Sequence, residues 1–393
     1  MTNLPQGWEV KKLEEIANIK GGKRLPKGEN LLDNNTKFAY IRVADFQDNG
    51  TINLQNIKFI NENTYNVLKN YKIYDDNLYI SIAGTIGKSG IIPKELNGAI
   101  LTENAVKLEY IQNNISNKFM YFFTLSNIFK TQIQTSTKIV AQPKLAITRL
   151  KQIQIPLPPL KEQERIVGIL DESFAKIDES IKILEQNLLN LDELMQSALQ
   201  KAFNPLKDNA KENYKLPQSW EWKSLEEISE NISAGGDKPK NCTESKTAKN
   251  QIPVYANGVN NNGLVGYTDK ATIIKPSLTI SARGTIGFVC IRKEPYFPIV
   301  RLISLIPCEN ILCLHYLYFC LNFFIAKGEG SSIPQLTIPK FKSLQIPLPP
   351  LKEQEQIAEH LDFVFEKAKA LKELYTKELK DYEELKQSLL DKA

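Results

Sequence analysis

Apolar residues recur at alternating spacings of four and three along residues 170–202, which is the pattern of a coiled-coil seam. The pattern predicts one long amphipathic helix, which Asn204-Pro205 would end because proline disfavours a helical conformation of the residue before it. So narrow an apolar stripe suits another helix better than a broad core, and we therefore expect a partner helix. The predicted seam positions are Leu170, Ile177, Ile181, Leu184, Leu188 and Leu191.

A second, looser ladder of apolar residues runs along residues 361–389 and is predicted to be that partner. Its spacing slips in register near Tyr375, which leaves the pairing of the two helices open. The alternative is that two unrelated amphipathic helices each lie on a domain of their own. The predicted seam positions are Leu361, Val364, Leu371, Leu379 and Leu389.

Each ladder follows a copy of one proline-rich stretch, called the proline motif below. The copies are Ile155-Pro-Leu-Pro-Pro-Leu-Lys-Glu-Gln-Glu-Arg-Ile166 and Ile346-Pro-Leu-Pro-Pro-Leu-Lys-Glu-Gln-Glu-Gln-Ile357, and eleven of their twelve positions match. Consecutive prolines hold the backbone extended, and Pro159 or Pro350 then suits the start of a helix, where a missing N–H costs nothing. A long helix is therefore expected to begin at each copy.

The repeat extends well beyond the proline motif. Residues 4–17 recur at 216–229, and Gly84-Thr-Ile-Gly87 recurs as Gly284-Thr-Ile-Gly287. Because the anchors keep their order, the chain contains one module copied whole. The expected domains are a first module (1–154), a first long helix with its linker (155–210), a second module (211–345) and a second long helix (346–393).

Within each module the pattern is that of a mixed α/β fold. β-branched and aromatic runs predict strands, and an apolar helix is expected near the end of each module. Examples are strands at 38–43, 78–82, 252–255 and 278–281, and apolar helices at 119–129 and 311–325. The predicted fold class is therefore mixed α/β (α+β), in two copies separated by two long antiparallel coiled-coil helices, with a pseudo-twofold internal repeat.

The middles of the two modules differ although their ends agree. Residues 40–46, for example, have no counterpart in residues 254–260. A shared frame with divergent inserts suits a scaffold that reads two different targets.

Charge divides along the chain in the same way. The net charge is +6 for residues 1–150, −3 for 151–210, +5 for 211–345 and −3 for 346–393. Two basic modules joined by acidic helices indicate a polyanion bound at two places. Ordinary solvated surface charge is the alternative.

Residues suited to catalysis or metal binding are scarce. The histidines are His315 and His360 alone, so neither a histidine metal cluster nor a histidine-based triad can occur in both modules. Cys308, Cys313, His315 and Cys320 lack the spacing of a zinc knuckle, which favours core cysteines. A recognition protein without catalysis is the simplest interpretation.

The N-terminus lacks the pattern of a signal peptide, and the longest apolar run, residues 311–325, is shorter than a bilayer span. All five cysteines lie in the second half of the chain, which favours free thiols in a reducing compartment over a disulfide framework. We therefore expect a cytoplasmic protein with no membrane partner.

Two modules that begin Leu-Pro-x-x-Trp, carry Gly-Thr-Ile-Gly and end in the proline motif before a long helix resemble a known family. This family is the DNA-specificity subunit of Type I restriction-modification systems, and the resemblance covers essentially the whole chain. It implies two target-recognition domains, each reading one half of a bipartite site in double-stranded DNA, and no catalysis by this chain. It also implies two modification (adenine methyltransferase) subunits and restriction (translocase-nuclease) subunits as partners. S-adenosylmethionine, ATP and Mg are then expected on the partner subunits, with no cofactor bound by this chain.

The candidate DNA-binding residues are cations beside glycine turns or at strand ends, together with the threonine of each Gly-Thr-Ile-Gly stretch. We expect several of them to contact phosphates or guanine edges. The Gly-Thr-Ile-Gly stretch itself is either a tight turn between strands or a bare backbone close to a phosphate. The candidates are Lys23, Arg24, Arg42, Thr85, Lys88, Lys238, Arg283 and Thr285.

Two other classes of function stay open at this point. One is a self-contained DNA methyltransferase or nuclease, and the other is a coiled-coil scaffold whose basic modules bind without reading sequence. The recognised bases, the length of the spacer between half-sites and the presence of a working restriction subunit do not follow from the sequence.

Overall fold

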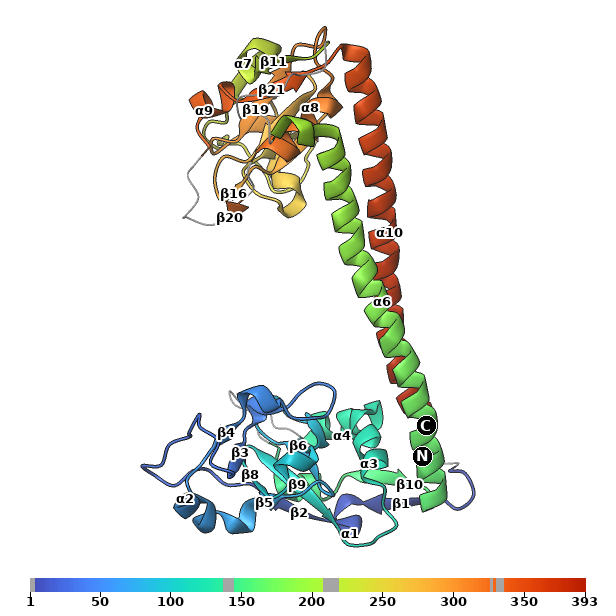
Figure 1. The fold of residues 1–393 in the computed structure, drawn as a ribbon. Helices are drawn as coiled ribbons and strands as arrows, with labels where there is room; N and C mark the ends of the chain where they lie inside the picture. Colours follow the sequence, from blue (N-terminus) through green and yellow to red (C-terminus); the bar gives the residue numbers. More distant parts are fainter. Residues whose placement is uncertain (1–3, 137–144, 208–218, 326–327, 330–335) are drawn as a thin grey trace. The chain divides into compact units, whose positions relative to one another are not determined.

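The computed structural model describes residues 4–136, 145–207, 219–325, 328–329 and 336–393 (Figure 1). The chain forms two compact units. The first unit comprises Met1–Leu184 with Lys377–Ala393, and the second comprises Glu185–Thr376. Each unit therefore contains one module together with part of both long helices.

The first module is built on a four-stranded antiparallel sheet in the order β2-β9-β6-β7. Its strands are β2 (Ala17–Gly21), β6 (Leu78–Ser81), β7 (Ser89–Ile91) and β9 (Ala105–Tyr110). A second sheet, in the order β4-β3-β8-β5, consists of β3 (Ala39–Ile41), β4 (Lys58–Phe59), β5 (Lys72–Ile73) and β8 (Ala99–Leu101). The helices are α1 (Leu13–Ile16), α2 (Glu62–Val67), α3 (Asn117–Leu125), α4 (Asn127–Ser136) and α5 (Ile147–Leu150).

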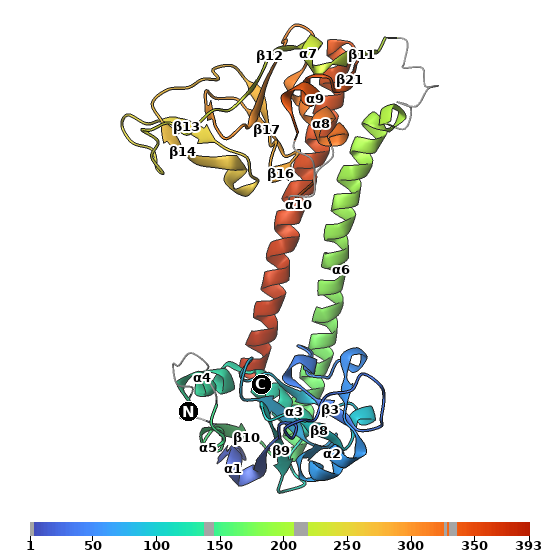
Figure 2. The ribbon, with the colours of Figure 1, turned by 90° about the vertical axis from the view of Figure 1, so that its left-hand side faces the viewer.

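The second module repeats the four-stranded sheet in the order β12-β19-β15-β17. Two strands of this sheet, β12 and β17, are labelled in Figure 2. Its strands are β12 (Ser229–Ala234), β15 (Ser277–Ile280), β17 (Val289–Arg292) and β19 (Ile303–Pro307). The other strands are β13 (Ile252–Tyr255), β14 (Leu264–Thr268), β16 (Thr285–Ile286), β18 (Phe297–Pro298) and β20 (Gly328–Glu329). The helices are α7 (Leu225–Ile228), α8 (Leu314–Phe324) and α9 (Ile338–Lys342). The mixed α/β class and the internal repeat are thus confirmed.

Corresponding apolar residues form the two module cores. Leu78 and Ile80 of β6 are fully buried in the first module, as are Leu278 and Ile280 of β15 in the second. The predicted apolar helix at 311–325 is α8, and five of its side chains are buried. The predicted helix at 119–129 is instead divided into α3 and α4, because Ser126 is extended and its hydroxyl donates to the carbonyl of Phe123.

The start of each module pairs with its proline motif. β1 (Glu9–Lys12) is antiparallel to β10 (Gln154–Leu157), with Glu9 opposite Leu157. In the second module β11 (Glu221–Ser224) pairs with β21 (Gln345–Leu348) in the same register. The two ends of the repeated module therefore meet at the root of a long helix. These helices are α6 (Leu160–Lys207) and α10 (Leu351–Lys392), and each begins directly after its prolines, as predicted.

The long helices pack antiparallel in each unit. In the first unit the Lys386 ammonium lies 2.5 Å from Asp178, and Leu389 packs near Leu170. In the second unit Lys372 forms an ion pair with Asp192. The predicted α6 seam positions are all buried or half-buried: Leu170, Ile177, Ile181, Leu184, Leu188 and Leu191.

The seam of α10 needs one correction. Leu361 is buried and Val364, Leu379 and Leu389 are half-buried, but Leu371 is 39% exposed and lies outside the seam. From Ala368 onward the inward positions keep the four-three spacing without a slip: Ala368, Lys372, Tyr375, Leu379, Tyr382, Lys386 and Leu389. The apparent slip arose because two seam positions are lysines, whose alkyl stems lie along the seam while their ammonium groups bind acids of α6.

α6 also continues to Lys207, past the predicted stop at Asn204-Pro205.

Candidate nucleic-acid interface

The strand register gathers the first-module candidates at one end of the sheet. β2 ends opposite the start of β9, and β6 ends at Ser81 opposite Ala105. Lys23 and Arg24 follow β2, while Thr85 and Lys88 lie in the turn between β6 and β7. We call the loops 22–24, 42–45, 82–88 and 102–104 the first sheet end.

Arg42 belongs to the same place. β3 ends at Ile41, which is paired with Leu101 of β8, and the backbone N–H of Thr102 donates to the Ile41 carbonyl at 3.0 Å. Arg42 therefore follows β3 where the chain enters the connection from β8 to β9. All five candidates of the first module lie at the first sheet end.

The second module repeats this arrangement. β12 ends at Ala234 opposite Ile303, and β15 ends at Ile280, which is also paired with Ile303. Lys238 lies four residues beyond β12, and Arg283 and Thr285 lie between β15 and β17. We call the loops 235–238, 281–288 and 299–302 the second sheet end.

Two glycine pairs, Gly21-Gly22 and Gly235-Gly236, allow close packing at the two sheet ends. A Cβ at Gly22 would lie 2.1 Å from the Thr102 carbonyl oxygen, and a Cβ at Gly235 would lie 2.6 Å from the backbone nitrogen of Ile299. Only glycine lets the chain after β2 or β12 approach the neighbouring connection so closely.

The two Gly-Thr-Ile-Gly stretches form the same tight turn, which confirms that interpretation. Gly87 has a φ of +87° and its N–H donates to the Ser81 carbonyl at 2.9 Å, and Gly287 has a φ of +81° and donates to Ser281 at 3.0 Å. Thr85 is exposed. The Thr285 hydroxyl is buried and has no hydrogen-bond partner among the described residues. Contact of either threonine with a phosphate stays a prediction.

Acidic side chains neutralise most cations of the first sheet end. Arg24 Nε lies 2.6 Å from Glu103 Oε1, and Lys88 Nζ lies 2.7 Å from Asp48 Oδ1. Burial raises the pKa of the Glu103 carboxyl, but the hydrogen bond from Arg24, with further ones, outweighs it and holds that pKa below its usual value. Lys23 has an aromatic neighbour instead of an acidic one, because its ammonium lies 5.9 Å from the centre of the Tyr71 ring.

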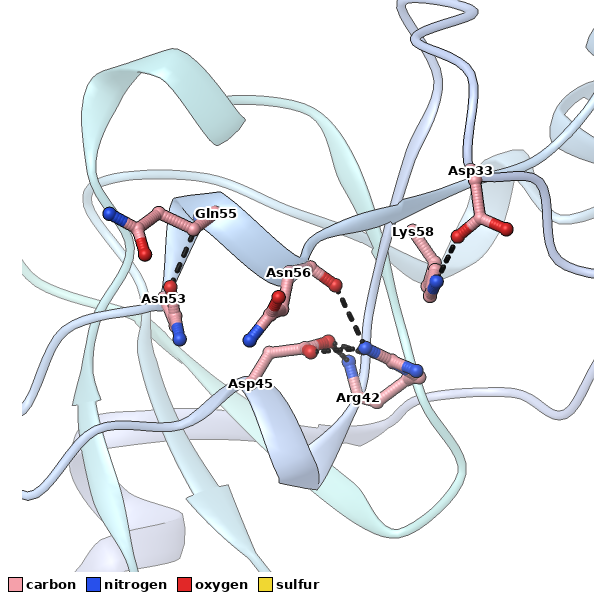
Figure 3. Close-up of polar contacts among 7 residues, drawn as sticks. All are labelled: Asp33, Arg42, Asp45, Asn53, Gln55, Asn56 and Lys58. Atoms are coloured by element: carbon pink, nitrogen blue, oxygen red, sulfur yellow. Dashed lines mark hydrogen bonds and ion pairs between the residues drawn. The ribbon is translucent and has the colours of Figure 1, made fainter.

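Arg42 is committed to Asp45, as Figure 3 shows. Its Nη2 lies 2.5 Å and its Nε 3.1 Å from the two carboxylate oxygens, and Nη2 also donates to the Asn56 carbonyl at 3.0 Å. The backbone N–H of Arg42 donates to the same carboxylate at 2.8 Å, and Asp45 is only 1% exposed. These bonds to Asp45 raise the pKa of Arg42. Arg42 thus orders its own loop, and a base would have to use the remaining side of the guanidinium.

Polar contacts within the neighbouring segments surround the Arg42–Asp45 pair (Figure 3). Lys58 forms an ion pair with Asp33, and the Asn53 side chain accepts a hydrogen bond from the Gln55 backbone at 3.0 Å. Short polar contacts of this kind fix the connections of the first module.

The cations of the second sheet end, unlike most of those at the first, are not neutralised by acidic side chains of the described residues. Lys238, Arg283 and also Arg301 are exposed, and none of them forms an ion pair within the described part of the chain. Arg301 was not among the sequence candidates, because it follows Val300 rather than a glycine. Arg292 was missed too, but it is buried, with its guanidinium carbon 3.6 Å from the centre of the Tyr255 ring and its Nε bonded to Thr279 at 3.0 Å.

The cysteine and histidine residues do not gather into a metal site. His315 Nδ1 lies 2.6 Å from Asp362 Oδ2, which ties α8 to α10, and Cys320 is buried in the core. The described residues contain no cluster of three or more histidine, cysteine, aspartate or glutamate side chains that could hold a metal ion. All five cysteines are free. Among the same residues, no helix is long and apolar enough to cross a bilayer.

Two copies of one α/β module, each with a loop-lined sheet end and a long helix at its root, define a repeat protein with two equivalent candidate interfaces. The family model described as the type I restriction modification DNA specificity domain matches residues 5–189 and again residues 217–380. The chain therefore belongs to this family, and as a specificity subunit it is a non-catalytic part of a Type I system.

Individual relatives agree with this assignment. A Mycoplasma pneumoniae protein named as a type I specificity subunit is 29% identical over 357 residues, which are 89% of this chain and 87% of that protein. The specificity subunit of the EcoBI type I restriction enzyme from Escherichia coli is 29% identical over 205 residues, 51% of this chain and 42% of that one.

A solved structure shares the fold. Its subject is complex assembly and conformational transition of the type I R-M system, and one of its chains matches with a TM-score of 0.80. The match covers 100% of this chain and 98% of that chain at 19% sequence identity.

Proposed function

We propose that this chain reads a bipartite target in double-stranded DNA, with one module on each half-site, and holds two modification subunits there. The observation that carries the proposal is the contrast between the sheet ends. The same sheet occurs twice, but the connection into β9 presents Glu103 paired with Arg24, whereas the connection into β19 presents Arg301 without an ion pair in the described residues. One scaffold with different side chains at the same place would recognise two different sequences.

The charge distribution supports DNA as the ligand. Each module is basic and each long helix is acidic, so phosphates would be attracted to the modules and repelled by the helices. Exposed Lys23, Lys238 and Arg283 would contact phosphates and set the orientation of each module. Base edges would be read by side chains of the differing loops.

The roots of the long helices offer a matched pair of hollows for partner subunits. In the second unit a hollow of about 610 Å³ lies between α6 and α10, and in the first unit a hollow of about 340 Å³ lies at the other helix root. Residues at equivalent positions of the two helix roots line both: Glu162, Ile166 and Leu170 in one, and Glu353, Ile357 and Leu361 in the other.

Exposed apolar side chains adjoin both hollows. Ile169 is 47% exposed in the first unit and Leu194 is 51% exposed in the second. Such side chains are suited to packing against another protein. Two equivalent hollows suit two copies of one partner, and we propose the modification subunits as that partner.

The partners would supply the chemistry. S-adenosylmethionine would bind to the modification subunits, and ATP and Mg to the restriction subunits, while this chain would bind none of the three. A complex that acts on chromosomal DNA would work in the cytoplasm.

Mapping of methylated adenines in cells that carry this chain and its modification subunits tests the proposal. We expect one motif of two short half-sites separated by a fixed spacer, absent from cells that carry the modification subunits alone. Methylation without a defined motif would instead favour a scaffold that binds DNA but does not read it.

A further inference from the structure

A two-residue turn at the second sheet end has an unusual backbone conformation. Val300 has a φ of +53° and Arg301 a φ of +59°, so both occupy the left-handed region. A β-branched residue is a genuine outlier there, because its side chain crowds the backbone. Such a turn persists only when surrounding groups hold it in place.

The turn is closed by a hydrogen bond from the Leu302 N–H to the Ile299 carbonyl at 3.1 Å, and three further hydrogen bonds join it to neighbouring segments. The Val300 N–H donates to the Gly236 carbonyl at 2.8 Å, and the Arg301 N–H donates to the Gly235 carbonyl at 2.9 Å. The Asn257 side-chain amide donates to the Val300 carbonyl at 2.6 Å. The glycine pair after β12 and the side chain of Asn257 therefore hold the turn from two different segments of the chain.

Asn257 also connects the turn to the neighbouring loop. Its Oδ1 accepts a hydrogen bond from the Ala282 N–H at 2.8 Å, directly before Arg283. One side chain thus fixes two cation-bearing loops relative to each other. Both loops belong to the second unit.

Both side chains of the strained turn are exposed to solvent. Val300 is 51% exposed and Arg301 is exposed, without an ion pair among the described residues. The corresponding connection of the first module, 102–104, has no positive φ, and its Glu103 is paired with Arg24. The shared scaffold therefore does not require the strain, which is specific to the second module.

We propose that Arg301 is a specificity-determining residue of the second module and reads a guanine in its half-site, with Asn257 as its positioning residue. The guanidinium fork matches the O6 and N7 acceptors that guanine presents in the major groove. A fixed backbone sets the position and direction from which the Arg301 side chain leaves the turn, whereas a solvated cation would need no such turn. Lys238 and Arg283, at the same sheet end, contact phosphates beside it. This inference rests on the proposed function.

The test uses the complex of the full chain with its modification subunits. Arg301→Gly removes the guanidinium and keeps a positive φ available, so the turn is retained. Lys293→Ala is the matched control, because Lys293 is an exposed cation that follows Arg292 at the opposite end of β17. Methylated adenines are mapped for each variant, and affinities are measured on duplexes with single base changes.

Arg301→Gly should lower the preference for guanine over other bases at one position of one half-site by about 5- to 150-fold. The other half-site should be read as before, and Lys293→Ala should read both halves normally. A duplex with 7-deazaguanine at that position, which lacks the N7 acceptor, should bind the native complex more weakly and the Arg301→Gly complex unchanged.

The positioning role of Asn257 has its own readout. Asn257→Ala should relax the same guanine position, and in the Arg301→Gly background it should relax that position no further. An additive second effect would show that Asn257 acts through something other than Arg301.

Two outcomes would overturn the inference while leaving the proposed function intact. One is an Arg301→Gly complex that keeps both half-sites and its affinity, and the other is a uniform loss of affinity on every duplex, which marks a phosphate contact. A native complex that methylates no bipartite motif would overturn the proposed function instead.

Discussion

Gln354 accepts a hydrogen bond from the backbone N–H of Cys313 at 2.9 Å, which fixes the start of α8 to the first turn of α10. The same side chain donates to the carbonyls of Ile311 at 2.9 Å and Pro349 at 2.8 Å, and it is fully buried. One glutamine thus satisfies three backbone groups where the module joins its helix.

Gln163 does the same in the first module. It accepts from the Ser116 N–H at 2.8 Å and donates to the carbonyls of Asn114 and Pro158 at 3.1 and 2.9 Å. The glutamine of the proline motif is therefore a clamp between module and helix, which explains why both copies of the motif contain it.

Gln354→Ala should destabilise the second unit because it leaves the Cys313 N–H and two carbonyls without partners. Buried backbone groups that lose their partners cost about 1–3 kcal/mol each, so we expect a loss of at least about 2 kcal/mol in the free energy of unfolding. Denaturant unfolding measures it. Gln356→Ala, two residues away and exposed, is the control and should change stability by less than about 0.5 kcal/mol. Equal losses in the two variants would contradict the clamp.

Lys372 and Lys386 occupy seam positions of α10 and should favour one register of the helix pair at some cost in stability. Replacing both by leucine should raise the free energy of unfolding by about 1–2 kcal/mol, because each leucine buries apolar surface that the ammonium groups leave wet. Thermal unfolding of the double variant checks this. Lys369→Leu, at an exposed position of the same helix, should not stabilise the chain. A less stable double variant would mean that the ion pairs contribute more than the leucines.

The sequence predicted those features that local patterns encode. The proline motif predicted where α6 and α10 begin, and the heptad spacing predicted most of both seams. Leu371 was wrongly predicted to lie in the seam, because a search for apolar residues does not detect a seam position occupied by Lys372. The seam becomes visible only through the partner acid on the other helix.

The candidate interface was predictable in part for the same reason. Cations beside glycines were found, and strand register brings them together at the sheet ends. The commitment of Arg42 to Asp45 and the left-handed turn at Arg301 were not found. The turn depends on hydrogen bonds between segments distant in the chain, such as Asn257 with Val300, which no local spacing encodes. Arg42 and Asp45 are only three residues apart, so a local pairing of their charges could have indicated that contact.

Arg42→Ala and Arg283→Ala should separate folding from binding. Removal of Arg42 leaves the Asp45 carboxylate, which is 1% exposed, with fewer donors, so the free energy of unfolding should fall by about 1–3 kcal/mol. Removal of Arg283, which is exposed, should leave stability unchanged and weaken DNA binding. Denaturant unfolding and binding isotherms on the same samples measure both effects. Unchanged binding by Arg283→Ala would assign Arg283 to the solvated surface.

Exchange of one module's middle should change one half of the methylated motif. Residues 38–104 contain β3 to β8, which include two strands of the shared sheet, β6 and β7, and the loops that differ most from the second module, whereas the repeated ends stay unchanged. Replacing this segment by that of a relative should therefore alter one half-site and keep the other. Sequencing of methylated adenines reads out the result. A change in both halves would show that the modules do not read independently.

The two long helices should determine the length of the spacer between the half-sites. Lys386 meets Asp178 and Lys372 meets Asp192, so both contacts follow one antiparallel register, in which a position near Leu184 corresponds to one near Leu379. Inserting seven residues at both places keeps the seam in register and adds about 10 Å, since a helix rises about 1.5 Å per residue. Because base pairs lie about 3.4 Å apart, the methylated motif should keep both half-sites and gain about three base pairs of spacer. A three-residue insertion would rotate the seam and should instead reduce stability or assembly with the modification subunits. Methylated-adenine mapping that finds the original spacer at full occupancy in the seven-residue variant would mean that these helices do not set the distance.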